Sequence, residues 1–192
     1  MIIYRDVFLD KELFNDAWSF EPVGAGKTLL RLKGKIVYEV PSTIDDSLIG
    51  GNKSAEADEP AATEDPVRTL NMPQLAEAVE PYTKKGYQSW LRRYIGRLMD
   101  KKEGEVAVLR NNGDGEEADK MGAELQIFKD KIELDIKDVI LSSFEEKDFK
   151  FYTADEDEYE VEGMLVPMTC PKDDPDVIFL YFIQYGLVTE EI

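Results

Sequence analysis

Two consecutive apolar stripes with helical spacing occupy the middle of the chain and restrict its fold more than any other feature. The first stripe comprises Tyr87, Leu91, Tyr94 and Leu98. Their spacing of four, three and four residues places them on one face of a helix. The sequence NNGDG then interrupts the pattern, and the second stripe comprises Met121, Leu125, Phe128, Ile132, Ile136 and Val139. We therefore predict an antiparallel helical hairpin over residues 83–142.

Strand patterns flank the helical hairpin on both sides. In LLRLKGKIVYEV, apolar and polar residues alternate on either side of Lys33 and Gly34, which predicts a β-hairpin that turns at these two residues. The run VIFLYFI, residues 177–183, predicts a strand covered on both faces. It is far shorter than the roughly 18 residues of a membrane span, so we expect no membrane insertion. A sheet built from both ends of the chain predicts an α+β fold in a single domain over residues 1–192.

An acidic segment, residues 41–66, separates the first strands from the helical hairpin. It contains seven acidic residues, one lysine and no aromatic residue. A segment of this composition cannot bury enough apolar surface to offset its ordering entropy. We expect a mobile acidic loop.

Charge is distributed unevenly along the chain. The net charge of −18 argues against binding to nucleic acid by the protein as a whole. Residues 83–103 nevertheless carry seven basic and two acidic side chains. Candidates for contact with an acidic partner such as tubulin are Lys85, Arg93, Arg97 and Lys101. An alternative stays open, in which this basic row pairs with the acidic second helix, whose carboxylates are Glu124, Asp130, Glu133, Asp135 and Asp138.

The residue types that most enzymes use are scarce. The chain has no histidine and one cysteine, Cys170. It therefore lacks imidazole for general-base catalysis, cannot form an internal disulfide, and is short of ligands for a zinc site. The charged opening MIIYRDVFLDKELF is unlike a secretory signal. We expect an intracellular protein without enzymatic activity.

The sequence GAGKT, residues 24–28, ends like a phosphate-binding loop. The full motif requires a glycine where this chain has Glu21, and LLRLKG after it predicts a strand rather than a helix. We therefore interpret GAGKT as a simple turn and expect no nucleotide cofactor.

Two acidic clusters are candidate ligands for a weakly bound calcium ion, because carboxylate oxygens suit this cation. They consist of Asp45, Asp46, Asp155, Glu156, Asp157 and Glu158. No EF-hand calcium loop can be aligned with the sequence, so a solvated acidic surface stays open as the alternative.

Three parts of the chain resemble the translationally controlled tumour protein family. The opening MIIYRD resembles the family's first strand, and IDDSLIGGNKSAEA resembles its first motif. The core of that motif loop is Ile49, Gly50, Gly51, Asn52, Ser54 and Glu56. YQSWLRRYIGRLMDK, IKDVILSSF and VIFLYFIQYGLV resemble the family's helical hairpin and final strand. The second family motif differs, since FYTAD at residues 151–155 replaces aromatic residues followed by Ile-Gly-Glu.

This resemblance implies a β-tent fold with a projecting helical hairpin, like that of certain chaperones that bind small GTPases. It implies a cytoplasmic protein that binds calcium and tubulin, contacts apoptosis regulators and is linked to growth and survival. By position, Glu12 matches an acidic residue proposed to contact a small GTPase, and Ser47 matches a serine phosphorylated by a polo-like kinase. The leading hypothesis is a binding protein that stabilises microtubules. The alternative is a regulator that promotes nucleotide exchange on a small GTPase.

Overall fold

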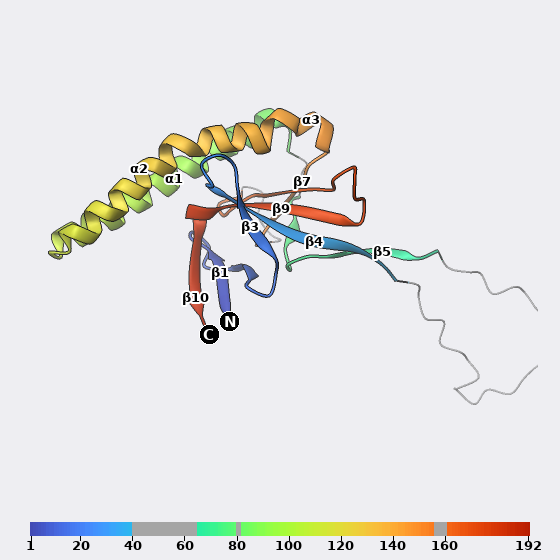
Figure 1. Ribbon diagram of the computed structural model, residues 1–192, viewed down its shortest axis with the longest axis horizontal. Helices are drawn as coiled ribbons and strands as arrows, with labels where there is room; N and C mark the ends of the chain where they lie inside the picture. The colour runs from blue at the N-terminus through green and yellow to red at the C-terminus, as the bar shows by residue number, and fades with distance from the viewer. Residues whose placement is uncertain (40–64, 80–81, 156–160) are drawn as a thin grey trace, which may run out of the picture.

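The computed structural model describes residues 1–39, 65–79, 82–155 and 161–192. Within these residues, ten strands form two sheets and two long helices form a pair (Figure 1). The predicted α+β fold with an inserted antiparallel helical hairpin is thereby confirmed. The expected mobile loop at residues 41–66 lies outside the described residues, apart from residues 65 and 66.

The smaller sheet joins the two ends of the chain. Its antiparallel strands follow the order β10-β1-β2 and are β1 Ile2–Asp6, β2 Glu12–Asn15 and β10 Leu187–Glu191. The amino group of Met1 donates a hydrogen bond to the Ile192 carbonyl at 3.0 Å. Both termini therefore lie at the same edge of the molecule (Figure 1).

The larger sheet follows the order β3-β4-β9-β8-β7-β6, and β5 pairs with the outer half of β4. Its strands are β3 Phe20–Val23, β4 Leu29–Glu39, β5 Val67–Asn71, β6 Ala76–Glu77, β7 Lys150–Thr153, β8 Val166–Thr169 and β9 Val177–Ile183. All residues of β9 are buried except Phe179, which is partly buried. The predicted strand covered on both faces is confirmed.

The predicted turn at Lys33 and Gly34 is wrong, because β4 runs without interruption from Leu29 to Glu39. Gly34 instead allows two strands to approach closely. A Cβ atom on Gly34 would lie 2.7 Å from Cγ1 of Ile178 and 2.8 Å from the carbonyl oxygen of Asn71. The glycine reflects tight sheet packing rather than a change of chain direction.

The helical hairpin consists of α1, Lys84–Asn111, and α2, Gly115–Val139. The hydroxyl of Thr83 caps α1 by accepting a hydrogen bond from the Gly86 amide at 3.1 Å. After α2, the chain forms the short helices η2 Leu141–Ser143 and α3 Phe144–Lys147, and η3 Gln184–Gly186 precedes β10. The end of the pair that holds the α1–α2 turn projects beyond the sheets (Figure 1). No helix in the described ranges is long and apolar enough to cross a bilayer.

The apolar stripes of the helical hairpin face the core, as predicted. In the first stripe, Tyr87, Tyr94 and Leu98 are buried and Leu91 is partly buried. The neighbouring Trp90 and Met99 are buried as well. In the second stripe, Leu125, Phe128, Ile132 and Ile136 are buried. Tyr87 stands 5.2 Å from the Phe151 ring and Phe128 stacks on Tyr185 at 4.4 Å, both measured between ring centroids. These aromatic contacts hold α1 against β7 of the larger sheet and α2 against η3, the short helix that follows β9.

Candidate functional site

The outward face of α1 carries basic side chains that make no ion pair within the described residues. Lys85, Arg93 and Lys101 are exposed. The suggested pairing of this row with the acidic residues of α2 is not observed in that part of the chain. The two helices are instead bridged close to their turn, where Arg110 lies 2.9 Å from Asp119. Lys85, Arg93 and Lys101 are therefore without an ion-pair partner in the described part of the chain.

Arg97, the fourth member of the predicted row, contacts the body of the protein instead of facing solvent with the other three. Its Nη1 donates a hydrogen bond to the Glu162 carbonyl at 2.8 Å. Its guanidinium carbon lies 4.2 Å from the centroid of the Phe8 ring, a cation–π distance. Arg97 therefore binds the helical hairpin to the body of the protein, and the sequence spacing did not reveal this.

Residues 161–164, here called the junction segment, form hydrogen bonds with α1 on one side and with Asp6 of β1 on the other. The indole Nε1 of Trp90 donates to the Val161 carbonyl at 3.1 Å, in addition to the Arg97 contact. From the opposite side, the amide of Met164 donates to the buried carboxylate of Asp6. The same carboxylate accepts from the Phe8 amide at 2.7 Å and the Leu9 amide at 3.2 Å. The junction segment thus ties α1 to the smaller sheet.

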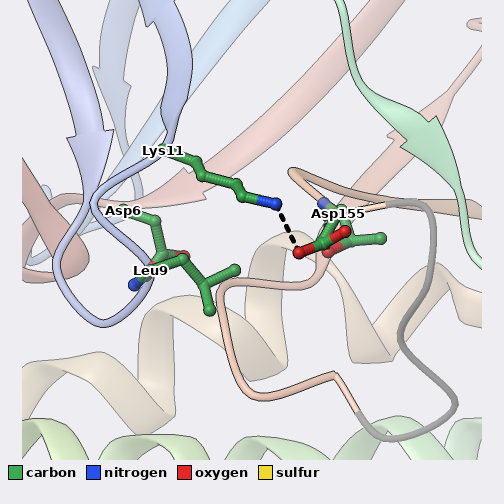
Figure 2. Close-up of polar contacts among 5 residues, drawn as sticks. Asp6, Leu9, Lys11 and Asp155 are labelled. Carbon is green, nitrogen blue, oxygen red and sulfur yellow. Dashed lines mark hydrogen bonds and ion pairs between the residues drawn. The ribbon is translucent and has the colours of Figure 1, made fainter.

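Asp155 is the one predicted calcium ligand that the structure describes. Its Oδ2 pairs with the ammonium of Lys11 across the gap between the β1–β2 loop and the end of β7 (Figure 2). A calcium ion there would have to compete with this cation. The part of the chain that the structure describes contains no cluster of three or more metal-ligating side chains. These residues therefore do not fit a calcium site on their own.

Twelve further predicted residues lie outside the described residues. They are the calcium candidates Asp45, Asp46, Glu156, Asp157 and Glu158, the motif-loop residues Ile49, Gly50, Gly51, Asn52, Ser54 and Glu56, and the phosphorylation candidate Ser47.

The GAGKT sequence is a turn between β3 and β4, as predicted, and the Lys27 amide closes it by donating to the Gly24 carbonyl at 3.1 Å. A carboxylate of the same chain occupies it. Asp135 of α2 accepts hydrogen bonds from the Gly26 amide at 2.8 Å, the Thr28 amide at 3.0 Å and the Thr28 hydroxyl at 2.7 Å. The loop binds an anion as phosphate-binding loops do, but the anion belongs to the protein.

Glycine is needed at two positions for this approach. A Cβ atom on Gly24, whose φ is +89°, would lie 2.4 Å from Cγ of Asp135. One on Gly26 would lie 2.5 Å from Cβ of Lys131. The absence of side chains at Gly24 and Gly26 therefore lets α2 bring the Asp135 carboxylate up to the backbone of the turn.

Burial acts to raise the pKa of Asp135, but hydrogen bonds from Gly26 and Thr28, together with the charge of Lys131, outweigh it and lower the pKa. Asp135 is therefore not one of the carboxylates available to pair with the basic row of α1, because its side chain is fully buried. One signal was available in the sequence: Asp135 lies beside Ile132 and Ile136 on the apolar stripe, where an unpaired carboxylate would be costly.

Glu12, the small-GTPase candidate, is exposed on the first position of β2. Its Oε1 accepts a hydrogen bond from Nδ2 of Asn15 at 3.2 Å. It lines a shallow hollow of about 400 Å³ that also includes Trp18 and Gln74. This hollow lies beside β2 of the smaller sheet and is lined by none of the basic residues of α1, so the structure does not bring the two candidate surfaces together.

A family model described as translationally controlled tumour protein matches residues 1–188 of the chain. The chain belongs to this family. Translationally controlled tumour proteins are not enzymes, which agrees with the prediction made from the missing catalytic residue types.

Two full-length relatives support the assignment. The translationally-controlled tumor protein homologs of Lumbricus rubellus and Xenopus tropicalis are 30% and 29% identical over 195 aligned positions. The alignments cover all of this chain and 100% and 99% of the two relatives. The mouse translationally-controlled tumor protein is 38% identical over 107 residues, which are 54% of this chain and 60% of the mouse protein.

The fold also matches a solved member of the family. The translationally controlled tumor-associated protein p23fyp from Schizosaccharomyces pombe superposes over the full length of both chains with a TM-score of 0.62 and 24% identity. This likeness shows the shared α+β architecture, including the long helical pair.

Proposed function

We propose that this protein is a non-enzymatic cytoplasmic binding protein that associates with microtubules through the basic face of α1. The observation that carries the proposal is the exposed set Lys85, Arg93 and Lys101, which make no ion pair within the described residues. A protein of net charge −18 repels an acidic partner at long range unless a local cationic surface leads the encounter. The projecting helical hairpin presents such a surface to the acidic tails of tubulin.

The test is cosedimentation of the full-length protein with microtubules. The variant combines Arg93→Glu and Lys101→Glu, while Arg97 is kept because it holds the helical hairpin in place. The matched control combines Lys120→Glu and Lys129→Glu, which change the charge equally on exposed positions of α2. We expect the first variant to lose binding and the control to keep most of it. Equal binding by both would show that the α1 face is not the contact surface.

We further propose weak calcium binding by the two acidic segments that contain Asp45 and Glu156, because carboxylate oxygens suit this cation. The binding should be weak because neither segment has an EF-hand pattern. The expected dissociation constant is on the order of 10⁻⁴ to 10⁻³ M. Titration calorimetry measures it directly. Affinity in the micromolar range would require a preformed site and would contradict the proposal.

The hollow beside Glu12 favours a second candidate function, promotion of nucleotide exchange on a small GTPase through the tent face. An exposed carboxylate next to an indole ring and a concave surface suits a polar protein contact. The test compares exchange rates with the wild-type protein, Glu12→Val and the control Glu116→Val at the hairpin tip. Loss of stimulation in the Glu12 variant alone supports this function, and no stimulation by the wild-type protein excludes it.

A further inference from the structure

A second concave surface, separate from the hollow beside Glu12, lies on the larger sheet. It is a hollow of about 870 Å³ bounded by β4, β5, β8, β9 and the segment from α3 to β7. That volume falls within the roughly 300–1,000 Å³ of typical small-molecule sites. Neither the basic face of α1 nor Glu12 takes part in it.

Basic side chains from distant parts of the sequence converge on this hollow. They are Arg31, Arg68, Lys147, Lys150 and Lys172. Three acidic residues, Glu146, Asp148 and Asp173, also line it, which leaves two more positive than negative charges. A cationic cavity is unexpected in a chain whose net charge is −18.

Three of these cations have no carboxylate partner within the described residues. Arg31 pairs with Glu21, and Nζ of Lys150 lies 3.8 Å from Glu77, but Lys147 and Lys172 make no ion pair there. Among the residues that the structure describes, Arg68 donates to the Cys170 sulfur at 4.0 Å, and sulfur is a weak acceptor. In the part of the chain that the structure describes, these three side chains are therefore not ion-paired, although Glu146, Asp148 and Asp173 line the same hollow.

Arg31 is held in place and incompletely satisfied. Its guanidinium carbon lies 4.6 Å from the centroid of the Phe179 ring, and its buried Nε–H has no hydrogen-bond acceptor in the described structure. A buried donor without a partner costs free energy. An anion that enters beside this guanidinium would offset part of that cost electrostatically.

The remaining walls are apolar or aromatic and include Leu70, Met168, Pro171, Phe179 and Tyr181. We propose that this hollow is a binding site for a phosphate monoester carried on an aromatic or apolar body. A monoester carries a charge close to −2 at neutral pH, so it can pair with two of the three cations that lack an ion-pair partner within the described residues. Arginine is well suited to bind phosphate oxygens through paired N–H groups. The apolar walls would contact the organic part of the ligand. This site goes beyond the proposed microtubule contact and does not depend on it.

The test is a titration of the full-length protein with phenyl phosphate, followed by calorimetry or by amide chemical shifts. Inorganic phosphate, benzoate and phenol serve as partial ligands. We expect phenyl phosphate to bind more tightly than any of the three. Arg68→Gln and Lys172→Gln should each weaken its binding about tenfold, since each removes a charge-assisted contact. Arg92→Gln, on an exposed position of α1, should leave the binding unchanged.

Several results would overturn the proposal. No binding of phenyl phosphate at millimolar concentration would remove the site, and equal weakening by Arg92→Gln would show that only the overall charge matters. Benzoate binding as tightly would overturn the choice of phosphate, and inorganic phosphate binding as tightly would overturn the role of the apolar walls. Arg68 and Lys172 are exposed, so neither substitution should unfold the protein. Circular dichroism and thermal unfolding of each variant check that the fold is retained.

Discussion

At the scale of single residues, Asp135 has the most demanding environment. Its carboxylate is buried on the apolar stripe of α2 and holds the turn at Gly26 and Thr28 with three hydrogen bonds. Its partners lie more than 100 residues away in sequence. No local pattern could therefore have identified them, although the position of a carboxylate between Ile132 and Ile136 was a visible anomaly.

Replacing Asp135 by asparagine should destabilise the protein by about 3 kcal/mol at pH 7, because an amide cannot accept all three hydrogen bonds and loses the charge. Urea unfolding measures the loss. Asp138→Asn, an exposed position on the same helix, should change the free energy of unfolding by less than about 0.5 kcal/mol.

The effect of Asp135→Asn should depend on pH. The pKa of Asp135 is lowered in the folded state, so its stabilising contribution is fully present above its ordinary value of 3.8. That contribution is lost as the pH falls through the lower, folded-state pKa. The difference in free energy of unfolding between the wild type and Asp135→Asn should shrink as the pH falls below 3.8. A difference that stays constant throughout this acid range would mean that the carboxylate charge is not what stabilises the turn.

Gly34 provides a second residue-scale prediction. Gly34→Ala should destabilise the protein by about 1–3 kcal/mol, because the new methyl group would overlap Ile178 and the Asn71 carbonyl. Gly104→Ala is the control, since nothing lies within 4 Å of its Cβ position on α1. There the substitution should stabilise the protein by up to about 1 kcal/mol. Two destabilised variants would indicate that the cost at position 34 is not steric.

At the scale of elements, the helical hairpin was predictable and the details of the sheets were not. The stripes through Tyr87 and Phe128 repeat within a few residues, so local spacing defines both helices. Alternation alone did not distinguish β4 from a hairpin, because β9, its partner over residues 29–35, lies far along the chain. The same reason hid the role of Arg97, whose contacts Phe8 and Glu162 come from two distant loops.

Arg97 should therefore behave as a structural residue. Arg97→Ala should lower the free energy of unfolding by about 2 kcal/mol through loss of the Glu162 hydrogen bond and the Phe8 contact. Arg93→Ala, one turn away and exposed, should change it by less than about 0.5 kcal/mol. Denaturant unfolding of the two variants side by side distinguishes them. Equal stability would show that the junction segment does not depend on Arg97.

At the scale of the whole molecule, the electrostatic asymmetry determines how the proposed microtubule association responds to salt. The contacts through Arg93 and Lys101 are exposed, and the Debye length falls to about 10 Å at 0.1 M ionic strength. We expect cosedimentation to weaken steeply between low and physiological salt. An association that is insensitive to salt would point to an apolar interface instead.

The pairing of β1 with β10 also determines an order of assembly. Ile2 and Glu191 are partners in the small sheet, so that sheet cannot be completed until the last strand has left the ribosome. The helices need only neighbouring residues and can form much earlier. Pulse-labelling hydrogen exchange during refolding should therefore protect α1 and α2 before β1. Once Val139 has been synthesised, a nascent chain can hold a formed helical pair while the smaller sheet still waits for β10.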